Sequence, residues 1–207
     1  MRVKLQKVYP ITDACLSGLS HAEQVARLSG GGALFIQLRE KHLSPREFYG
    51  EAEEALRVAR ERGVRVIVND RVDIALALGA DGVHLGQDDL ATEAARRVLG
   101  EEAIVGFSTH NIEQALEAAS LPVDYIAIGP VFATSSKENP DRVVGLDGLR
   151  RVREAIKDLP LVAIGGITRE NAHEVIAAGA DSVAVISALL AEPAEIEERT
   201  RAFFASL

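Results

Sequence analysis

The sequence predicts a single (β/α)8 TIM barrel, an α/β fold, over residues 1–207. Eight short apolar runs alternate with longer amphipathic segments, which is the number of units expected for a closed parallel barrel. The runs are rich in β-branched residues and nearly continuous in apolarity, as is typical of parallel strands covered by helices. No Pro-rich or Ser-rich linker interrupts them, so one domain is expected. An open doubly wound sheet is the alternative, but eight similar units favour closure.

The predicted strands are the short apolar runs, at 8–12, 34–38, 65–69, 82–85, 104–108, 125–129, 161–165 and 182–187. The clearest helix follows the second run. Ser44 caps it, Pro45 is its first helical residue and Glu47 completes a capping box. Apolar residues recur at helical spacing over 48–59, and Gly63 ends the helix.

Composition excludes several classes of protein. Apolar residues make up 47% of the 207 residues, enough for a sizeable core, and the net charge of −8 argues against nucleic-acid binding. The single cysteine, Cys15, excludes an internal disulfide framework and fits a reducing compartment. The first ten residues lack the apolar core of a signal peptide, and the apolar run at 183–191 is too short to span a bilayer. We expect a cytoplasmic protein without membrane partners; the oligomeric state, including a homo-oligomer, stays open.

Acidic residues fall on both sides of the predicted strands. Asp81, Asp124 and Asp181 each precede a strand, which places them at the amino-terminal face of a parallel barrel and predicts a structural role. Asp70 instead follows its strand. It is therefore expected at the carboxyl-terminal face, where barrel active sites lie.

Further polar side chains are expected at that face. Arg39 and Lys41 follow the second strand and Lys137 follows the sixth, and cations so placed suit a polyanion such as a diphosphate. Asp70 and Asp89 end neighbouring strands, and two carboxylates beside a diphosphate would repel it unless a divalent cation bridged them. Mg²⁺ commonly takes one or two carboxylates plus phosphate oxygens, although each aspartate alone would more often be a helix cap.

A second anion site is expected beside the first. The turn at 165–166 and the end of the eighth strand match the usual phosphate site of barrels. Other candidates have simpler interpretations. His84 is expected to be a packed strand histidine, His110 either a helix-start residue or a hydrogen-bonding residue at the rim, and the glycines at 30–32 a helix stop.

The ordered motifs resemble one family. "YPITD", "IQLREK", "VNDRVDIALALGADGVHLGQDD", "GFSTHN", "YIAIGPVFATSSK", "VAIGGI" and "VAVIS" are together similar to thiamine-phosphate synthase, over about Tyr9 to Ser187. That family is a group of transferases of thiamine biosynthesis, which join an aminopyrimidine-methyl diphosphate to a thiazole phosphate and release diphosphate.

The resemblance assigns residues to each substrate. The pyrimidine diphosphate would be held by Gln37, Leu38, Arg39, Glu40, Lys41, Asn69, Ser108 and Lys137. The thiazole phosphate would be held by Thr134, Ser135, Ser136, Gly166, Ile186 and Ser187. Asp70 and Asp89 would bind one Mg²⁺, and Lys41, Lys137 and Ser108 would be catalytic. The family commonly has a proline and a second threonine where Ala133 and Ser136 stand, so a modest change in affinity is expected.

Three alternatives remain at this point. The related thiazole tautomerases share the fold but need no diphosphate or metal; they have a degraded counterpart of Asn69-Asp70 and a histidine in place of Pro130. A second alternative is a non-catalytic regulator that binds a phosphorylated metabolite. A sugar-phosphate isomerase or aldolase is the third, but it needs a base or a Schiff-base lysine on a strand, and no interior strand lysine is visible.

Overall fold

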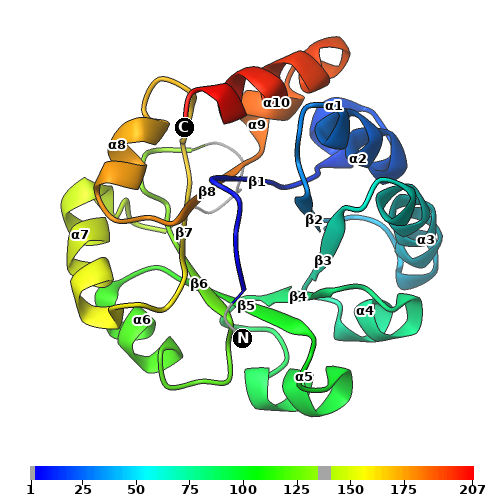
Figure 1. The fold of residues 1–207 in the computed structure, drawn as a ribbon. Helices are drawn as coiled ribbons and strands as arrows, with labels where there is room; N and C mark the ends of the chain where they lie inside the picture. Colours follow the sequence, from blue (N-terminus) through cyan, green and yellow to red (C-terminus); the bar gives the residue numbers. More distant parts are fainter. Residues whose placement is uncertain (1–2, 135–140) are drawn as a thin grey trace.

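Eight parallel strands form a ring that is surrounded by helices (Figure 1). The computed structural model describes residues 3–134 and 141–207. The strands are β1 (Val8–Pro10), β2 (Phe35–Leu38), β3 (Arg65–Asn69), β4 (Gly82–Leu85), β5 (Ile104–Thr109), β6 (Tyr125–Ile128), β7 (Leu161–Ile164) and β8 (Ser182–Val185). They pair in the order β1-β8-β7-β6-β5-β4-β3-β2, and a parallel bridge between Ile11 and Gln37 brings the two ends of the sheet together. The predicted TIM barrel is therefore confirmed.

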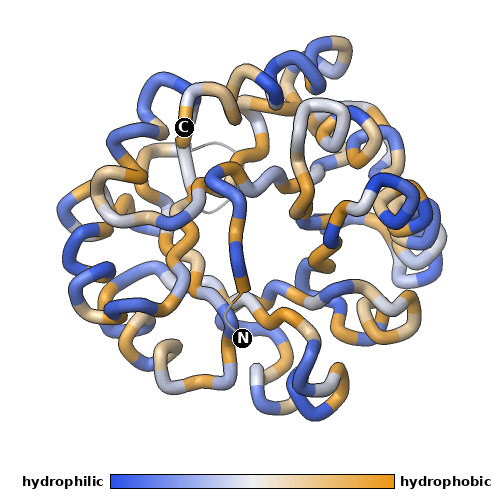
Figure 2. Tube along the Cα trace, in the orientation of Figure 1, coloured by the Kyte–Doolittle hydropathy of each residue, from blue (hydrophilic) through white to orange (hydrophobic). Residues whose placement is uncertain are grey.

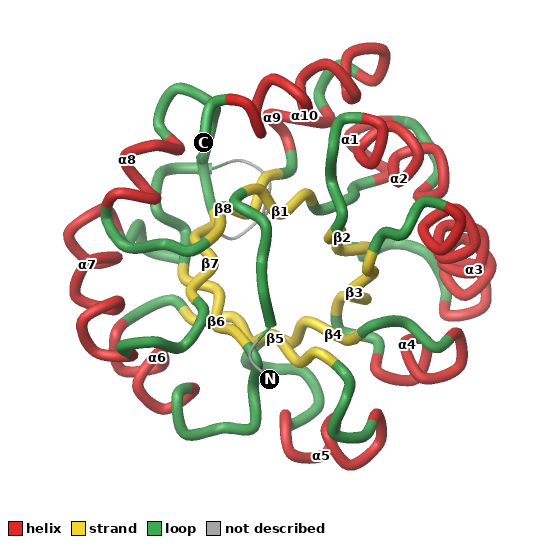
Figure 3. Tube along the Cα trace, in the orientation of Figure 1, coloured by secondary structure: helices red, strands yellow, loops and turns green. Residues whose placement is uncertain are grey.

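The helices lie outside the ring (Figure 3). They are α1 (Ala14–Ser17), α2 (His21–Gly30), α3 (Pro45–Glu61), α4 (Val72–Leu78), α5 (Thr92–Leu99), α6 (Ile112–Ala118), α7 (Gly145–Ile156), α8 (Ala172–Ala177), α9 (Ser187–Leu190), the 3₁₀ turn η1 (Pro193–Glu195) and α10 (Ile196–Ala205). Hydrophobic and hydrophilic residues alternate along them (Figure 2), as expected for helices with one buried face. Within residues 3–134 and 141–207, none has the length and apolarity needed to cross a membrane.

Four predicted strands end earlier in the structure than expected: 125–129 and 161–165 by one residue, and 8–12 and 182–187 by two. The first run continues to Thr12, but β1 ends at Pro10; beyond it the Ile11 N–H still bonds to the Val185 carbonyl, and Ile11 forms only the isolated bridge to Gln37. The eighth continues to Ser187, but β8 stops at Val185 because the backbone turns at Ile186 into α9. These differences arise where the chain leaves the sheet, and periodicity does not locate that point.

The predicted capping of α3 is confirmed. The Ser44 hydroxyl accepts the Glu47 N–H, and the Glu47 carboxylate accepts the Ser44 N–H at 2.9 Å. Pro45 is the first residue of the helix, which ends at Glu61. Gly63 follows with φ +67°, a left-handed conformation that suits glycine.

The core has two layers. An outer layer packs the strands against the helices, and an inner cluster fills the barrel. The inner cluster consists of Tyr9, Ile11, Phe35, Ile67, Tyr125, Ala127, Val162 and Ala184. These residues come from inward-facing positions of the strands, and those nearest the carboxyl ends form the base of the site described below.

The amino-terminal face carries the predicted structural aspartates. The Asp81, Asp124 and Asp181 side chains each accept a backbone N–H from the preceding strand, at 2.8 Å. Arg96 and Arg153 pair with the second and third of them. The structural role expected for these aspartates is confirmed.

Candidate active site

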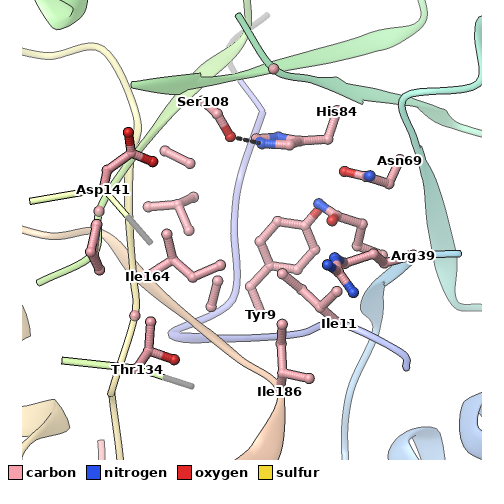
Figure 4. A pocket seen from close by; sticks show the side chains of 18 of the residues that line it. Tyr9, Ile11, Arg39, Asn69, His84, Ser108, Thr134, Asp141, Ile164 and Ile186 are labelled. Atoms are coloured by element: carbon pink, nitrogen blue, oxygen red, sulfur yellow. Dashed lines mark hydrogen bonds between the residues drawn. The ribbon is translucent and has the colours of Figure 1, made fainter. Parts of the chain in front are cut away.

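A cavity of about 1050 Å³ opens at the carboxyl ends of the strands. Polar side chains, among them Arg39, Asn69, His84 and Ser108, line one side of it (Figure 4). Apolar side chains such as Ile164 form another part of the wall. The cavity therefore offers a polar region for charged groups beside an apolar surface for a ring.

Asp70 and Asp89 approach each other from neighbouring loops. Asp70 follows β3 with φ +61°, a left-handed conformation that aspartate tolerates, and its N–H donates to the His84 carbonyl at 2.8 Å. Asp89 is held by the Gly86 N–H at 2.7 Å. Burial raises the pKa of Asp70, the adjacent Lys41 ammonium lowers it, and neighbouring Asp89 raises it further. The two carboxylates thus form an acidic site that a nearby positive charge stabilises.

Lys41 supplies part of that positive charge. Its ammonium lies 2.5 Å from an Asp70 oxygen. The loop that carries it is held by Glu40, whose carboxylate accepts the N–H groups of Lys41 and His42 at 2.8 and 2.7 Å and also that of Leu43. Glu40 therefore orders the loop from outside the cavity.

Other polar groups complete this side of the site. The Arg39 guanidinium pairs with Asp13 at 3.0 Å, which directs it along the rim. Asn69 ends β3 and is largely buried, and it is paired in register with His84 on β4. Gln37 is buried on β2 and donates to the Tyr9 hydroxyl at 3.1 Å.

His84 is more than a packing residue. Its Nε2 lies 2.8 Å from the Ser108 hydroxyl and its Nδ1 lies 3.0 Å from the Tyr125 hydroxyl. Burial lowers the pKa of His84 to about 4, a shift that Asp89 opposes. The ring is therefore neutral near pH 7.

The opposite side of the cavity is built from the ends of β6, β7 and β8. Gly165 and Gly166 have φ values of +102° and +63°, and a Cβ on Gly166 would come within 2.5 Å of the Ala133 carbonyl. Glycine is thus required where the two loops meet. Thr134, Ile186 and Ser187 also line the cavity here, and α9 begins at Ser187.

Most of the predicted site residues that the structure describes lie together. The cavity lining includes Gln37, Arg39, Lys41, Asn69, Asp70, Asp89, Ser108, Thr134, Gly166, Ile186 and Ser187. Leu38 and Glu40 do not line it; the Leu38 side chain is buried in the outer layer of the core. Ser135, Ser136 and Lys137 fall outside the described residues.

Sequence reasoning missed part of the lining. Tyr9 and Ile11 contribute to the base of the cavity, and strand alternation would have found them, since they point inward from the first strand. Asp141 lies 3.4 Å from His110, whose Nδ1 is also 2.8 Å from the Gly129 carbonyl. His110 is thus the rim hydrogen-bonding residue of the two alternatives. No local signal marks Asp141, because a long connection brings it to the rim.

The acidic pair fits Mg²⁺. Among residues 3–134 and 141–207, no three or more His, Cys, Asp or Glu side chains form a group that could hold a metal ion by themselves. Mg²⁺ nevertheless often takes only one or two carboxylates, with phosphate oxygens and waters as its other ligands. Asp70 and Asp89 would supply those two carboxylates.

Fold and cavity together define the class of protein: a TIM-barrel enzyme whose site suits phosphorylated substrates. Residues 8–189 match the family model described as thiamine monophosphate synthase. The chain belongs to this family of transferases.

Individual relatives agree with the family match. A thiamine-phosphate synthase of Koribacter versatilis is 52% identical over 198 residues, which cover 92% of each chain. One of Clostridium novyi is 47% identical, covering 89% of this chain and 90% of the relative. The solved thiamine phosphate pyrophosphorylase of Pyrococcus furiosus superposes with a TM-score of 0.86 at 40% identity, covering 97% of this chain and 94% of that one.

Proposed function

We propose that this enzyme joins 4-amino-2-methyl-5-(diphosphooxymethyl)pyrimidine to a thiazole phosphate, giving thiamine phosphate and diphosphate. The observation that carries the proposal is the pair Asp70 and Asp89, which approach each other beside the Lys41 ammonium at the mouth of an apolar-based cavity. A tautomerase or a simple phosphate binder has no need of such a pair. Family membership supports the same activity.

The diphosphate would lie against the polar wall. Lys41 and Arg39 supply positive charge there, and Asn69 and Ser108 supply hydrogen-bond donors. Lys137, outside the described residues, is assigned to the same group from the sequence. Mg²⁺ held by Asp70 and Asp89 would neutralise charge that accumulates on the leaving diphosphate.

The pyrimidine would lie on the apolar base. Tyr9, Ile11, Ala127 and Val162 offer a surface of the right character for an aromatic ring, and Gln37 places an amide beside it. This surface keeps water from the methylene carbon while the diphosphate departs.

The thiazole phosphate would occupy the opposite side. Barrel enzymes commonly bind phosphate at the loops after the seventh and eighth strands and at the start of a short extra helix. Gly166 belongs to the first of these loops, Ile186 and Ser187 lie at the second, and α9 is the short helix. Thr134, with Ser135 and Ser136 beyond the described residues, would complete this subsite.

The reaction then needs charge stabilisation more than proton transfer. The bond between the methylene carbon and the diphosphate oxygen breaks, and its electrons leave with the diphosphate. The aminopyrimidine ring stabilises the resulting cation. The thiazole nitrogen attacks through its lone pair, so no proton has to be removed from the nucleophile. Lys41, Arg39 and Ser108 act by stabilising the leaving group.

A direct assay tests the proposal. The purified protein is mixed with the pyrimidine diphosphate, the thiazole phosphate and Mg²⁺, and thiamine phosphate and diphosphate are measured. Equal amounts of the two products are expected. Conversion of a thiazole substrate alone, without diphosphate release, would instead indicate the tautomerase activity. Asp70→Ala tests for a non-catalytic binder. Such a binder should show no turnover with or without the substitution and should keep its affinity for thiazole phosphate, whereas a synthase should lose turnover in the variant.

A further inference from the structure

A line of buried polar side chains crosses the barrel interior and ends at the cavity. Gln37 Nε2 lies 3.1 Å from the Tyr9 hydroxyl, which lies 3.0 Å from the Tyr125 hydroxyl. Tyr125 in turn lies 3.0 Å from His84 Nδ1, and His84 Nε2 lies 2.8 Å from the Ser108 hydroxyl. Figure 4 shows the last of these contacts at the cavity wall. Four hydrogen bonds therefore connect β2, β1, β6, β4 and β5.

If every hydroxyl hydrogen in this line has an acceptor, the donor in each of its hydrogen bonds is fixed. The Gln37 amide donates to the Tyr9 oxygen, so the Tyr9 hydrogen needs another acceptor. Tyr9 is 2% exposed, and among the described residues its other hydroxyl partner is Tyr125. Because buried hydroxyl hydrogens are rarely left unpaired, Tyr9 donates to Tyr125.

The same reasoning continues to the cavity. Tyr125 accepts from Tyr9, so its own hydrogen is directed to His84 Nδ1. A neutral imidazole that accepts at Nδ1 carries its hydrogen on Nε2. His84 Nε2 then donates to the Ser108 oxygen. The Ser108 hydrogen has no role inside the line and is left for a group in the cavity.

We propose that His84 is a positioning residue: by donating from Nε2, it makes the Ser108 hydroxyl a donor toward an anion bound in the cavity. Where that anion is the leaving diphosphate, the inference rests on the proposed function. With the hydrogen on Nδ1 instead, Ser108 would donate to Nε2 and present lone pairs to the anion. The line of hydrogen bonds thus fixes the orientation in which the Ser108 hydroxyl donates to the anion.

The surroundings of the ring support a fixed tautomer. The His84 ring stacks on the Tyr125 ring with centroids 5.5 Å apart and an interplanar angle of 23°. Both ring nitrogens have partners, which holds the ring in one orientation.

The tautomer can be measured directly. We expect ¹⁵N NMR of histidine-labelled protein at pH 7.5 to give His84 an Nδ1 shift typical of an unprotonated ring nitrogen and an Nε2 shift typical of an N–H nitrogen. The His84→Gln spectrum assigns the signals. A proton on Nδ1 would overturn the inference, and this result does not depend on whether the protein has the proposed activity.

A double-mutant cycle tests the link to Ser108. His84→Leu should lower kcat/KM about ten- to a hundredfold, in line with the usual contribution of a hydrogen bond to a charged group. In a Ser108→Ala background the same change should have almost no further effect. His84→Gln keeps a donor near the Nε2 position and should recover most of the activity. Equal losses in both backgrounds would contradict the proposal.

Two additions keep the cycle decisive. Ile67→Val makes a small gap in the same inner cluster and removes none of the line's hydrogen-bonding groups, so it should leave kcat/KM within about twofold; a large loss would mean that packing alone explains His84→Leu. The affinity for magnesium diphosphate, measured by calorimetry, should follow the same pattern as kcat/KM. If the unaltered protein makes no product, the proposed function fails, and the calorimetric cycle still decides the role of His84.

Discussion

At the residue scale, the site depends on where two carboxylates are placed. Asp70 lies just after β3 in a left-handed conformation, and Asp89 is fixed by a backbone N–H. Lys41 pairs with Asp70 across the loops after β2 and β3. Because these carboxylates and the ammonium are close together and partly buried, the site can bind a cation and an anion side by side.

Asp70→Asn should lower kcat about a hundred- to a thousandfold, the size of comparable electrostatic effects in catalysis. The same variant should require more Mg²⁺ for half-maximal rate, since one ligand loses its charge. Steady-state kinetics over a magnesium titration measures both. Asp73→Asn is the matched control, because Asp73 is three positions away, pairs with Arg71 and does not line the cavity. An unchanged magnesium requirement in Asp70→Asn would contradict the assignment.

His21 gives the stability a pH dependence. It is fully buried beside Thr12 and Glu40, and burial lowers the pKa of His21 although Glu40 opposes the shift. The unfolded chain therefore binds a proton more readily than the folded one. The free energy of unfolding should fall as the pH drops below about 6.5, the value of a free histidine. Urea unfolding at pH 7.5 and 5.5 measures this, and His21→Gln should show a smaller difference between the two.

At the element scale, the loop after β2 is held in place by Glu40 from outside the cavity. Glu40 accepts three backbone N–H groups of residues 41–43, and its other oxygen lies 3.3 Å from His21 Nε2. His21 also contacts Thr12 at 2.7 Å, which ties this loop to the end of β1. Although burial of Glu40 would raise its pKa, the N–H groups and His21 together lower it, so the carboxylate stays charged.

Glu40→Ala should raise the KM for the pyrimidine diphosphate about tenfold with a smaller change in kcat, because Lys41 loses its fixed position. Initial-rate measurements at saturating thiazole phosphate separate the two constants. Glu47→Ala is the control: it removes half of the α3 capping box and should cost roughly 1 kcal/mol of stability without changing KM. An unchanged KM in Glu40→Ala would show that loop order does not govern substrate binding.

At the scale of the whole molecule, the two faces of the barrel have separate tasks. The carboxyl-terminal face holds the cavity, whereas the amino-terminal face holds aspartates that satisfy strand N–H groups. Arg96 and Arg153 reinforce that second face by contacting Asp124 and Asp181 and nearby carbonyl groups. Stability and catalysis should therefore respond to different substitutions.

Asp124→Ala should lower the free energy of unfolding by about 1–3 kcal/mol, because the Val105 N–H loses its side-chain acceptor and the Arg96 guanidinium loses its carboxylate partner. Chemical denaturation measures the loss. Activity of the folded protein should stay within about twofold, since the site lies at the other face. Asp147→Ala is the control, because that side chain is 95% exposed, and it should change stability by less than about 0.5 kcal/mol. A large loss of kcat in Asp124→Ala would contradict the separation of the two faces.

Much of the fold and site could be predicted from local patterns. The α3 caps, the strand positions and the side of each strand on which an aspartate falls depend on neighbouring residues in the chain, so they are visible in the sequence. Strand alternation could have placed Tyr9 inside the barrel, but neither its bond to Tyr125, 116 positions later and 3.0 Å away, nor the place of Asp141 at the rim could be read from neighbouring residues. Contacts of this kind have no local signal.

The sequence by itself determined the barrel, the face on which polar groups gather and the family resemblance, because alternation, capping and strand-end chemistry are properties of short segments. Only the tertiary structure decided that Glu40 holds the loop after β2 from outside the cavity and that His84 bonds to both Tyr125 and Ser108. The physical reason is that a hydrogen bond depends on the distance and direction between atoms, and closure of the ring brings together atoms from strands that are distant in the chain.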